Sequence, residues 1–178
     1  MQRNSKSHGQ ATQPIVLIGM MGVGKSTIGR RLAARLGRDF VDADDEIASA
    51  AGMSIPDIFE CYGEKEFRDG ERRVIARLVD QSDSVIAAGG GAFMNSETRT
   101  LILEKAVAIW LDADIDILVE RVSRREGRPL LIGKDPKTVL TELAAIRNPV
   151  YALAPLHVIS GDGPHELTVN RIMEALEQ

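Results

Sequence analysis

A short apolar run that passes directly into a glycine-rich turn constrains this chain most. Residues 15–27 read IVLIGMMGVGKST, and four of them match the pattern G-x-x-x-x-G-K-[ST]: Gly19, Gly24, Lys25 and Ser26. Glycines let backbone N–H groups curl around a phosphate, and the helix that follows adds its positive N-terminal end. Because strand, loop and helix occur in the required order, we favour a nucleoside-triphosphate site over an ordinary strand–turn–helix.

Two side chains of this loop have separate tasks in the donor site. Lys25 can reach the β- and γ-phosphates, and the Ser26 hydroxyl can ligate Mg²⁺. The loop therefore predicts the phosphate donor and its cofactor, Mg²⁺. It leaves open which molecule receives the phosphate, and that answer has to come from other parts of the chain.

The rest of the chain alternates between strand and helix patterns five times, which predicts an α/β fold. We expect a five-stranded parallel sheet with helices on both faces. The expected strands lie at residues 15–18, 40–46, 84–88, 106–111 and 157–160. Between the second and third strands, an amphipathic helix over residues 58–79 is expected to break or bend at Gly63 and Gly70.

Length and composition fit one globular domain. We expect a disordered polar tail over residues 1–14 and a single domain over residues 15–178. The net charge of -4 gives no basic field for nucleic acid or a membrane surface. No apolar run approaches the ~20 residues of a membrane span, and the N-terminus lacks a signal-peptide core. The single cysteine, Cys61, excludes an internal disulfide, and we expect its side chain to be at least half-buried. A cytoplasmic monomer is the expectation.

Two carboxylates, Asp42 and Asp44, follow the second expected strand, where ligands of parallel sheets bind. Side chains two residues apart on an extended chain point to the same side. One carboxylate could then hold Mg²⁺ through a water, and the other could orient or deprotonate an alcohol. A solvated acidic turn or helix N-terminus fits the same spacing, so the spacing alone leaves both readings open.

Three further features suggest a polar ligand, although each is weak by itself. Gly89-Gly-Gly91 at a strand end indicates close approach of a ligand or of another segment, unless it is a plain turn. Arg68 and Arg147 carry the forked side chain that suits a carboxylate, although a lone arginine is more often a surface charge. Residues 121–135 form a basic, Gly- and Pro-containing segment, which we expect to be a mobile lid that excludes water.

Six motifs together resemble those of the shikimate kinases, small P-loop enzymes with a nucleoside-monophosphate-kinase-like fold. Besides the glycine loop, they are Asp42-Ala-Asp44, Glu66-Phe-Arg68, Gly89-Gly-Gly91, Arg128-Pro-Leu-Leu131 and Arg147-Asn-Pro-Val-Tyr151. The resemblance spans residues 15–176, and the motifs occur in the expected order. Many NTPases share the glycine loop, whereas the combination of the other five is far more specific.

The resemblance implies ATP-dependent phosphorylation of the 3-hydroxyl of shikimate, on the route to chorismate and aromatic amino acids. It assigns ATP to Gly22, Val23, Gly24, Lys25, Ser26, Thr27, Arg121 and Arg128. It assigns shikimate to a region at about residues 44–70 and to Asp44, Arg68, Gly89, Gly90, Gly91 and Arg147. It assigns Mg²⁺ to Ser26 and, through a water molecule, to Asp42. The catalytic residues are then Lys25, Asp44 and Arg128.

Two departures and two rival readings accompany this resemblance. Ala87-Ala88 stands where many relatives carry a hydroxyl, and residues 161–164 lack the cation that relatives often place beside adenine. One rival is a gluconate-type or nucleoside-monophosphate kinase; two arginines placed for one carboxylate favour a carboxylated acceptor over a neutral polyol. The other is a nucleotide-binding homologue without turnover. The intact Lys25, Asp44 and Arg128 argue against that rival.

Overall fold

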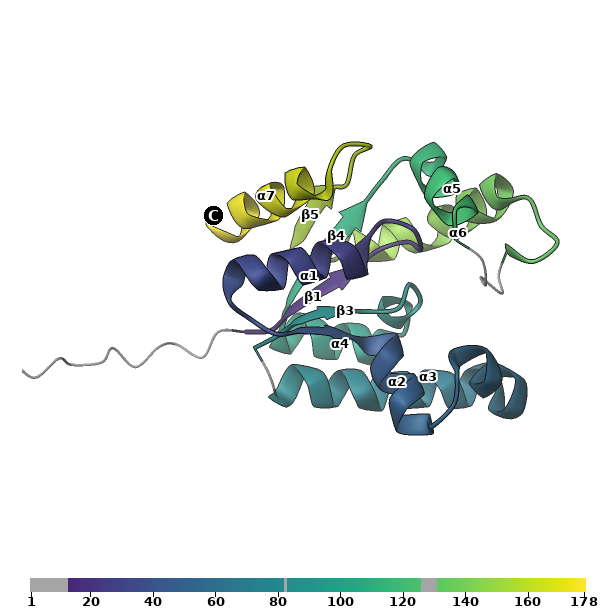
Figure 1. Cartoon of the computed structure of the whole chain (residues 1–178). Coiled ribbons are helices and arrows are strands. Elements are labelled where there is room, and N and C mark those ends of the chain that lie inside the picture. Colours follow the sequence, from purple (N-terminus) through teal and green to yellow (C-terminus); the bar gives the residue numbers. More distant parts are fainter. Residues whose placement is uncertain (1–12, 82, 126–130) are drawn as a thin grey trace, which may run out of the picture.

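A computed structural model describes residues 13–81, 83–125 and 131–178 of the chain. Its centre is a sheet of five parallel strands in the order β2-β3-β1-β4-β5 (Figure 1). The strands are β1 (Ile15–Ile18), β2 (Phe40–Asp42), β3 (Val85–Ala87), β4 (Val107–Asp112) and β5 (Leu156–Ile159). The predicted five-stranded parallel sheet is therefore confirmed.

Helices cover both faces of the sheet, as predicted. The α-helices are α1 (Lys25–Leu36), α2 (Ala43–Ala51), α3 (Ile55–Gln81), α4 (Ser96–Lys105), α5 (Ile115–Ser123), α6 (Pro136–Tyr151) and α7 (His165–Leu176), and a 3₁₀ turn, η1 (Ala92–Met94), follows β3. Helices α1 and α7 lie together on one face, and α3 and α4 lie on the other (Figure 1). None of the helices in the described ranges is long and apolar enough to cross a membrane.

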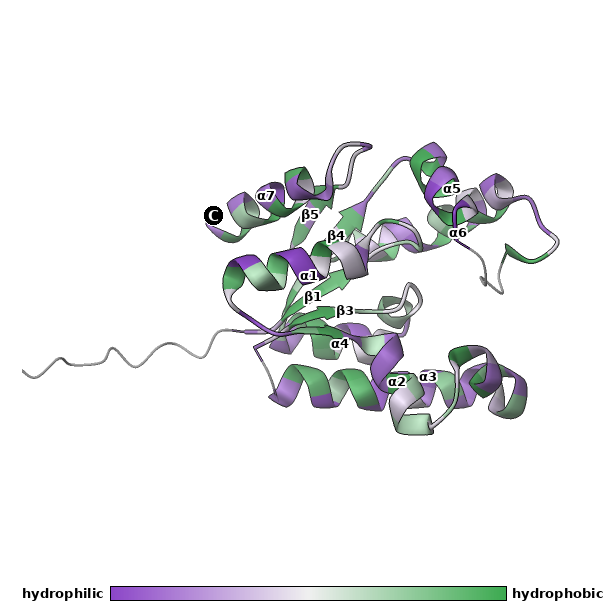
Figure 2. Cartoon of the chain, viewed as in Figure 1, coloured by the Kyte–Doolittle hydropathy of each residue, from purple (hydrophilic) through white to green (hydrophobic). Residues whose placement is uncertain are grey.

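The core follows from the apolar strands at the centre of the sheet. All four residues of β1 are buried, and hydrophobic residues dominate the strands between the helix layers (Figure 2). Helix α1 packs very closely on the sheet, because a side chain at Gly29 would come within 2.5 Å of the Phe40 ring. This packing fixes the N-terminus of α1 at the carboxyl end of β1, which is where the glycine loop lies.

The acidic segment after β2 differs from the expectation. Strand β2 ends at Asp42, and α2 begins one residue later, so Asp42 and Asp44 are not neighbours on one side of a strand. Instead, Asp42 caps the helix, and its Oδ1 accepts a hydrogen bond of 3.0 Å from the backbone N–H of Asp44. Carboxylates are stabilised in the first turn of a helix by its positive end, which explains why the helix starts within the acidic run.

Three further local predictions concern the glycines of α3, the exposure of Cys61 and the extent of the N-terminal tail. Helix α3 is interrupted at Gly63, where φ is 81°, but it runs through Gly70 without a break. Cys61 is exposed, contrary to the expectation of a buried or half-buried side chain. Pro14 is buried, and its carbonyl accepts a hydrogen bond from Val107 N, so residues 13 and 14 belong to the domain rather than to a tail. Residues 1–12 of the expected tail lie outside the described residues.

Candidate active site

A cavity of about 540 Å³ opens at the carboxyl ends of the central strands. The glycine loop, the start of α2, the residues after β3, the end of α5 and the start of α7 form its walls. The sequence-predicted residues on these walls are Gly22, Gly24, Lys25, Ser26, Thr27, Asp42, Asp44, Gly89, Gly90 and Arg121. Residues far apart in the sequence therefore meet in one cleft, as expected for the carboxyl edge of an open parallel sheet.

The backbone of the glycine loop requires glycine at its turns. Gly22 and Gly24 have φ angles of 81° and 102°, which other residues rarely adopt. At Gly19 a side chain would overlap the carbonyl oxygen of Leu111 on β4. Val23 does not line the cavity. Its side chain is fully buried, and its carbonyl accepts hydrogen bonds from Arg121 and Ser160. The loop is therefore held rigidly before it meets any phosphate.

A cation and two possible metal ligands lie at the mouth of this loop. The cation is Lys25, and the ligands are the oxygen atoms of Ser26 and Asp42. The Lys25 ammonium donates hydrogen bonds to the carbonyls of Gly19 at 2.8 Å and Met20 at 3.1 Å. The Ser26 hydroxyl donates to Asp42 Oδ2 at 2.7 Å. The described residues contain no cluster of three or more His, Cys, Asp or Glu suited to a metal. One hydroxyl and one carboxylate nevertheless suit Mg²⁺, which keeps several waters and takes phosphate oxygens.

Asp44 lies in the same cleft with a perturbed acidity. Burial raises the pKa of its carboxyl, and the negative charge of Asp42 raises it further. The positive charges of Lys25 and Arg68 act in the opposite direction. A carboxylate with a raised pKa, close to the phosphate-binding loop, is a suitable proton acceptor or hydrogen-bond acceptor for an alcohol.

Each glycine of the Gly89–Gly91 run faces a charged side chain. A Cβ at Gly89 would lie 3.0 Å from Asp44 Oδ1, and one at Gly90 would lie 2.9 Å from Arg147 Nη1. At Gly91 it would lie 2.5 Å from Arg68 Nη2. None of the three positions has a positive φ. The run is therefore explained by space rather than by backbone conformation, because a side chain at any of them would push a charged group away.

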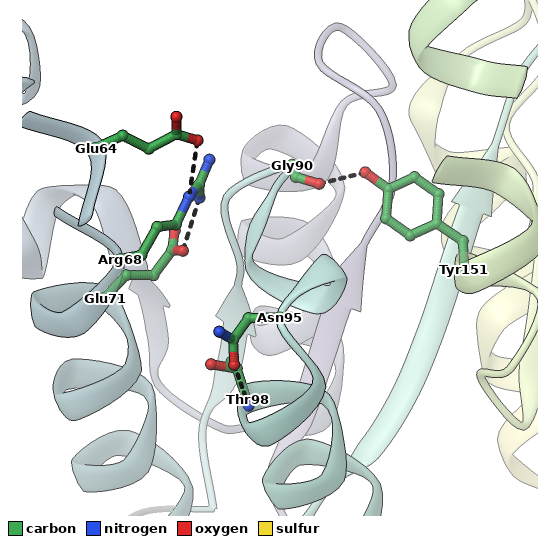
Figure 3. A network of polar contacts seen from close by, with 7 residues as sticks. All are labelled: Glu64, Arg68, Glu71, Gly90, Asn95, Thr98 and Tyr151. Carbon is green, nitrogen blue, oxygen red and sulfur yellow. Dashed lines mark hydrogen bonds and ion pairs between the residues drawn. The ribbon is translucent and has the colours of Figure 1, made fainter. Parts of the chain in front are cut away.

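A buried acid holds Arg68 in place. Glu71, only 2% exposed, accepts a hydrogen bond of 2.8 Å from Arg68 Nη1, and Glu64 lies 3.8 Å from Arg68 Nε (Figure 3). Burial raises the pKa of Glu71, while the charge of Arg68 lowers it. Glu71 is not among the residues predicted from the sequence. The available signal was a charged residue on the apolar face of α3, three positions after an arginine that was already a candidate.

Arg68, Gly91 and Arg147 adjoin the cavity but are not among the described residues of its walls. Arg147 Nη1 lies beside Gly90, which lines the cavity, and the Arg68 guanidinium lies beside Gly91. Both guanidinium groups therefore converge on the same short backbone segment from different helices. Two arginines facing one segment form a fork suited to a carboxylate.

Arg121 fastens the glycine loop to the segment that follows β5. Its guanidinium donates to the carbonyl of Val23 at 3.0 Å and to the carbonyl of Gly161 at 2.7 Å. It also lines the cleft, next to His165 at the start of α7. His165 is not among the residues predicted from the sequence, although it follows directly after residues 161–164, the segment that lacks a cation. Burial lowers the pKa of His165, and the charge of Arg121 lowers it further.

The expected lid is described only at its two ends. Arg121 belongs to α5, and Arg124 and Arg125 line the cavity after the end of this helix. Arg128 and the rest of residues 126–130 lie outside the described residues. The role assigned to Arg128 therefore stays a prediction.

Comparisons with known proteins agree on one family. The family model for shikimate kinase matches residues 21–177. Shikimate kinase from Zymomonas mobilis is 61% identical over 162 residues, 91% of this chain and 92% of that protein. The Caulobacter vibrioides enzyme is 60% identical over 164 residues, covering 92% and 82% respectively.

A solved structure extends the agreement to three dimensions. Shikimate kinase from Acinetobacter baumannii, in complex with shikimate, superposes with a TM-score of 0.88 at 34% identity, covering 92% of each chain. The family match includes residues 21–27 of the glycine loop, the three glycines that face charged groups and the two converging arginines. On sequence and on structure alike, this chain belongs to the shikimate kinase family.

Proposed function

We propose that this chain transfers the γ-phosphoryl group of ATP to the 3-hydroxyl of shikimate, giving shikimate 3-phosphate and ADP for the biosynthesis of chorismate and aromatic amino acids. One observation carries this proposal: Arg68 and Arg147 converge on Gly90 and Gly91, and Gly90 lines the same cleft as the phosphate-binding loop. A carboxylated alcohol matches this pairing better than a neutral polyol, because each guanidinium can bind a carboxylate with two parallel hydrogen bonds. Gluconate is also a carboxylated alcohol, and membership of the shikimate kinase family favours shikimate over it.

The donor side holds and neutralises the polyphosphate. Backbone N–H groups of residues 22–27 and the N-terminus of α1 bind the phosphates, and Lys25 adds positive charge beside the β- and γ-phosphates. Ser26 and, through water, Asp42 would hold the metal. Bound Mg²⁺ supplies positive charge to the phosphate oxygens. Phosphoryl transfer asks the protein mainly for positioning and charge stabilisation, and this arrangement provides both.

The acceptor side aligns the hydroxyl with the γ-phosphate. Asp44 accepts a hydrogen bond from the 3-hydroxyl and takes its proton as the oxygen–phosphorus bond forms and ADP leaves. Arg68 and Arg147 bind the carboxylate, and the glycine segment contacts the ring hydroxyls. Holding both substrates in one orientation lowers the barrier by removing much of the entropy cost of their encounter.

The lid completes the proposal. Residues 121–135 would close over the bound nucleotide, with Arg128 directed at the phosphates and Arg121 beside adenine, and closure would protect ATP from water. The single cysteine and the small-molecule substrates suit a monomeric enzyme of the reducing cytoplasm.

A coupled assay of ADP release tests the proposal against its rivals. The full chain is supplied with ATP and Mg²⁺ and, in separate reactions, with shikimate, gluconate or AMP. We expect rapid turnover with shikimate alone. Tight ATP binding with no turnover on shikimate would refute the assignment, and turnover on gluconate or AMP would move the chain to a related kinase activity.

A further inference from the structure

Tyr151 ends α6 in the substrate half of the molecule, and the mechanism above gives it no role. Its side chain is fully buried, and its hydroxyl donates a hydrogen bond to the carbonyl oxygen of Gly90 (Figure 3). Its ring lies 6.1 Å from the ring of Trp110 on β4. A phenol fixed by a strand on one side and bonded to a glycine carbonyl on the other is a rigid anchor.

Gly90 is the point at which the two halves of the site meet. A Cβ at this position would lie 2.9 Å from Arg147 Nη1, 3.8 Å from the Tyr151 hydroxyl and 3.6 Å from the carbonyl oxygen of Gly19. Arg147 and Tyr151 are four residues apart on α6 and therefore share one face of that helix. One helix face thus holds the acceptor segment against the first glycine of the phosphate-binding loop.

The neighbouring backbone groups explain what the anchor achieves. Among the described residues, the N–H groups of Gly89, Gly90 and Gly91 donate to no protein acceptor, while Ala88 N and Ala92 N are both bonded. The carbonyl of Gly90 and the N–H of Gly91 belong to one planar peptide unit and point in opposite directions. When Tyr151 binds that carbonyl, the N–H of Gly91 must face away from α6. Arg68 lies on that opposite side of Gly90 (Figure 3).

We propose that Tyr151 is a positioning residue for the acceptor: its hydroxyl fixes the Gly90–Gly91 peptide so that this N–H and the guanidinium groups of Arg68 and Arg147 face the substrate together. The inference rests on the proposed function, because it names how the same acceptor site is held in shape. Burial raises the pKa of Tyr151, so the phenol keeps its proton and remains a donor across the working pH range.

The test removes one oxygen atom. Tyr151→Phe keeps the ring and its packing. Thr141→Val is the matched control, because it also removes one hydroxyl from α6, but Thr141 is exposed, bonds only the carbonyl of Lys137 through that hydroxyl and is not on the cavity walls. We expect the shikimate KM of Tyr151→Phe to rise about five- to tenfold, the effect of losing one hydrogen bond that orients the binding groups. The ATP KM of the same variant should change less than about twofold, and Thr141→Val should leave both values unchanged.

The possible results separate this inference from the proposed function. An unchanged shikimate KM, or an equal rise in both KM values, would make Tyr151 a packing residue and overturn the inference. If the unmodified chain phosphorylates gluconate or AMP but not shikimate, the proposed function fails. The role of Tyr151 is then tested with that acceptor: its KM should rise in Tyr151→Phe while the ATP KM stays nearly unchanged.

A spectroscopic measurement does not depend on turnover. In the Tyr62→Phe chain, 3-fluorotyrosine labels Tyr151 alone, so a single ¹⁹F resonance reports on its hydroxyl. We expect this resonance to shift when shikimate is added and to stay in place when ATP is added alone. A resonance that saturating shikimate leaves unmoved would contradict the positioning role.

Discussion

The proposed donor and acceptor halves of the site are built in different ways. The phosphate-binding loop of the donor half is one continuous stretch, residues 19–27, whose own turns and helix create the site, and only Asp42 and the arginines assigned to the lid come from other segments. The acceptor half takes Asp44 from α2, Arg68 from α3, the glycine run from the segment after β3 and Arg147 from α6. Its geometry therefore depends on how four segments pack against one another.

Because of this difference, we expect substitutions to act differently in the two halves. A change in the donor loop alters the chemistry directly, because the backbone and the side chains that bind phosphate are the same residues. A change in the acceptor half can act at a distance, because a side chain added to a glycine displaces an arginine from another helix. Substitutions in the two halves should therefore affect different kinetic constants.

The largest effect is expected for Lys25→Ala in the donor half. Removing this positive charge beside the transferring phosphate should lower kcat by about 10³-fold, since such charges act mainly in the transition state. The measurement is ADP release at saturating shikimate and ATP. Arg35→Ala is a matched control on the exposed side of the same helix and should be close to normal. Near-normal turnover of Lys25→Ala would refute the role given to this lysine.

Asp44→Asn tests the residue that stands between the two halves. We expect kcat to fall about 10²-fold or more, the usual size of a general-base contribution. Because burial and Asp42 raise the pKa of Asp44, the unmodified enzyme should lose activity as the pH falls through this raised value, above the ordinary range of an aspartate. The pH profile of kcat measures this. An acid limb that persists unchanged in Asp44→Asn would belong to another group.

Two glycine substitutions, Gly90→Ala and its control Gly70→Ala, test the acceptor half. Gly90→Ala places a methyl group 2.9 Å from Arg147 Nη1, so the shikimate KM should rise about tenfold or more as the clamp is displaced. Gly70→Ala, within α3, is the control, because a Cβ there meets nothing within 4 Å. That control should stabilise the protein slightly, by about 1 kcal/mol or less, measured by thermal unfolding.

The Gly90→Ala variant also tests whether the donor and acceptor halves are independent. The Gly90 position also lies 3.6 Å from the carbonyl of Gly19 in the donor loop. If Gly90→Ala raises the ATP KM as much as the shikimate KM, the two halves are not independent, and the division drawn above is wrong. We expect the ATP KM to stay within about twofold, because an effect confined to acceptor binding leaves the donor constant unchanged.

The smallest effect is expected for Arg147→Lys. The charge is kept, but a single ammonium cannot replace a planar fork, so the shikimate KM should rise about five- to tenfold with little change in kcat. Steady-state kinetics with shikimate as the varied substrate measure this. An unchanged KM would place Arg147 outside the substrate site.

Much of the fold and of the donor half could be predicted from the sequence because both depend on local patterns. The alternation of apolar strands and amphipathic helices specified the parallel sheet, and nine consecutive residues specified the phosphate-binding loop. The prediction failed where two local signals compete. The acidic run at residues 42–46 was read as a strand, but a capping carboxylate and the helix dipole start α2 immediately after Asp42.

Only the tertiary structure decided how the acceptor half is assembled. The sequence named Arg68, Arg147 and the triple glycine, but not that each glycine leaves room for one charged side chain. It also missed Glu71, His165 and the bond from Tyr151 to Gly90. The last two residues are 61 positions apart and lie in different segments, so no local pattern connects them. The residues of a phosphate-binding loop are consecutive in the sequence, so the shape of the loop follows largely from its own backbone. A carboxylate clamp is made by the packing of helices, and that packing exists only once the chain has folded.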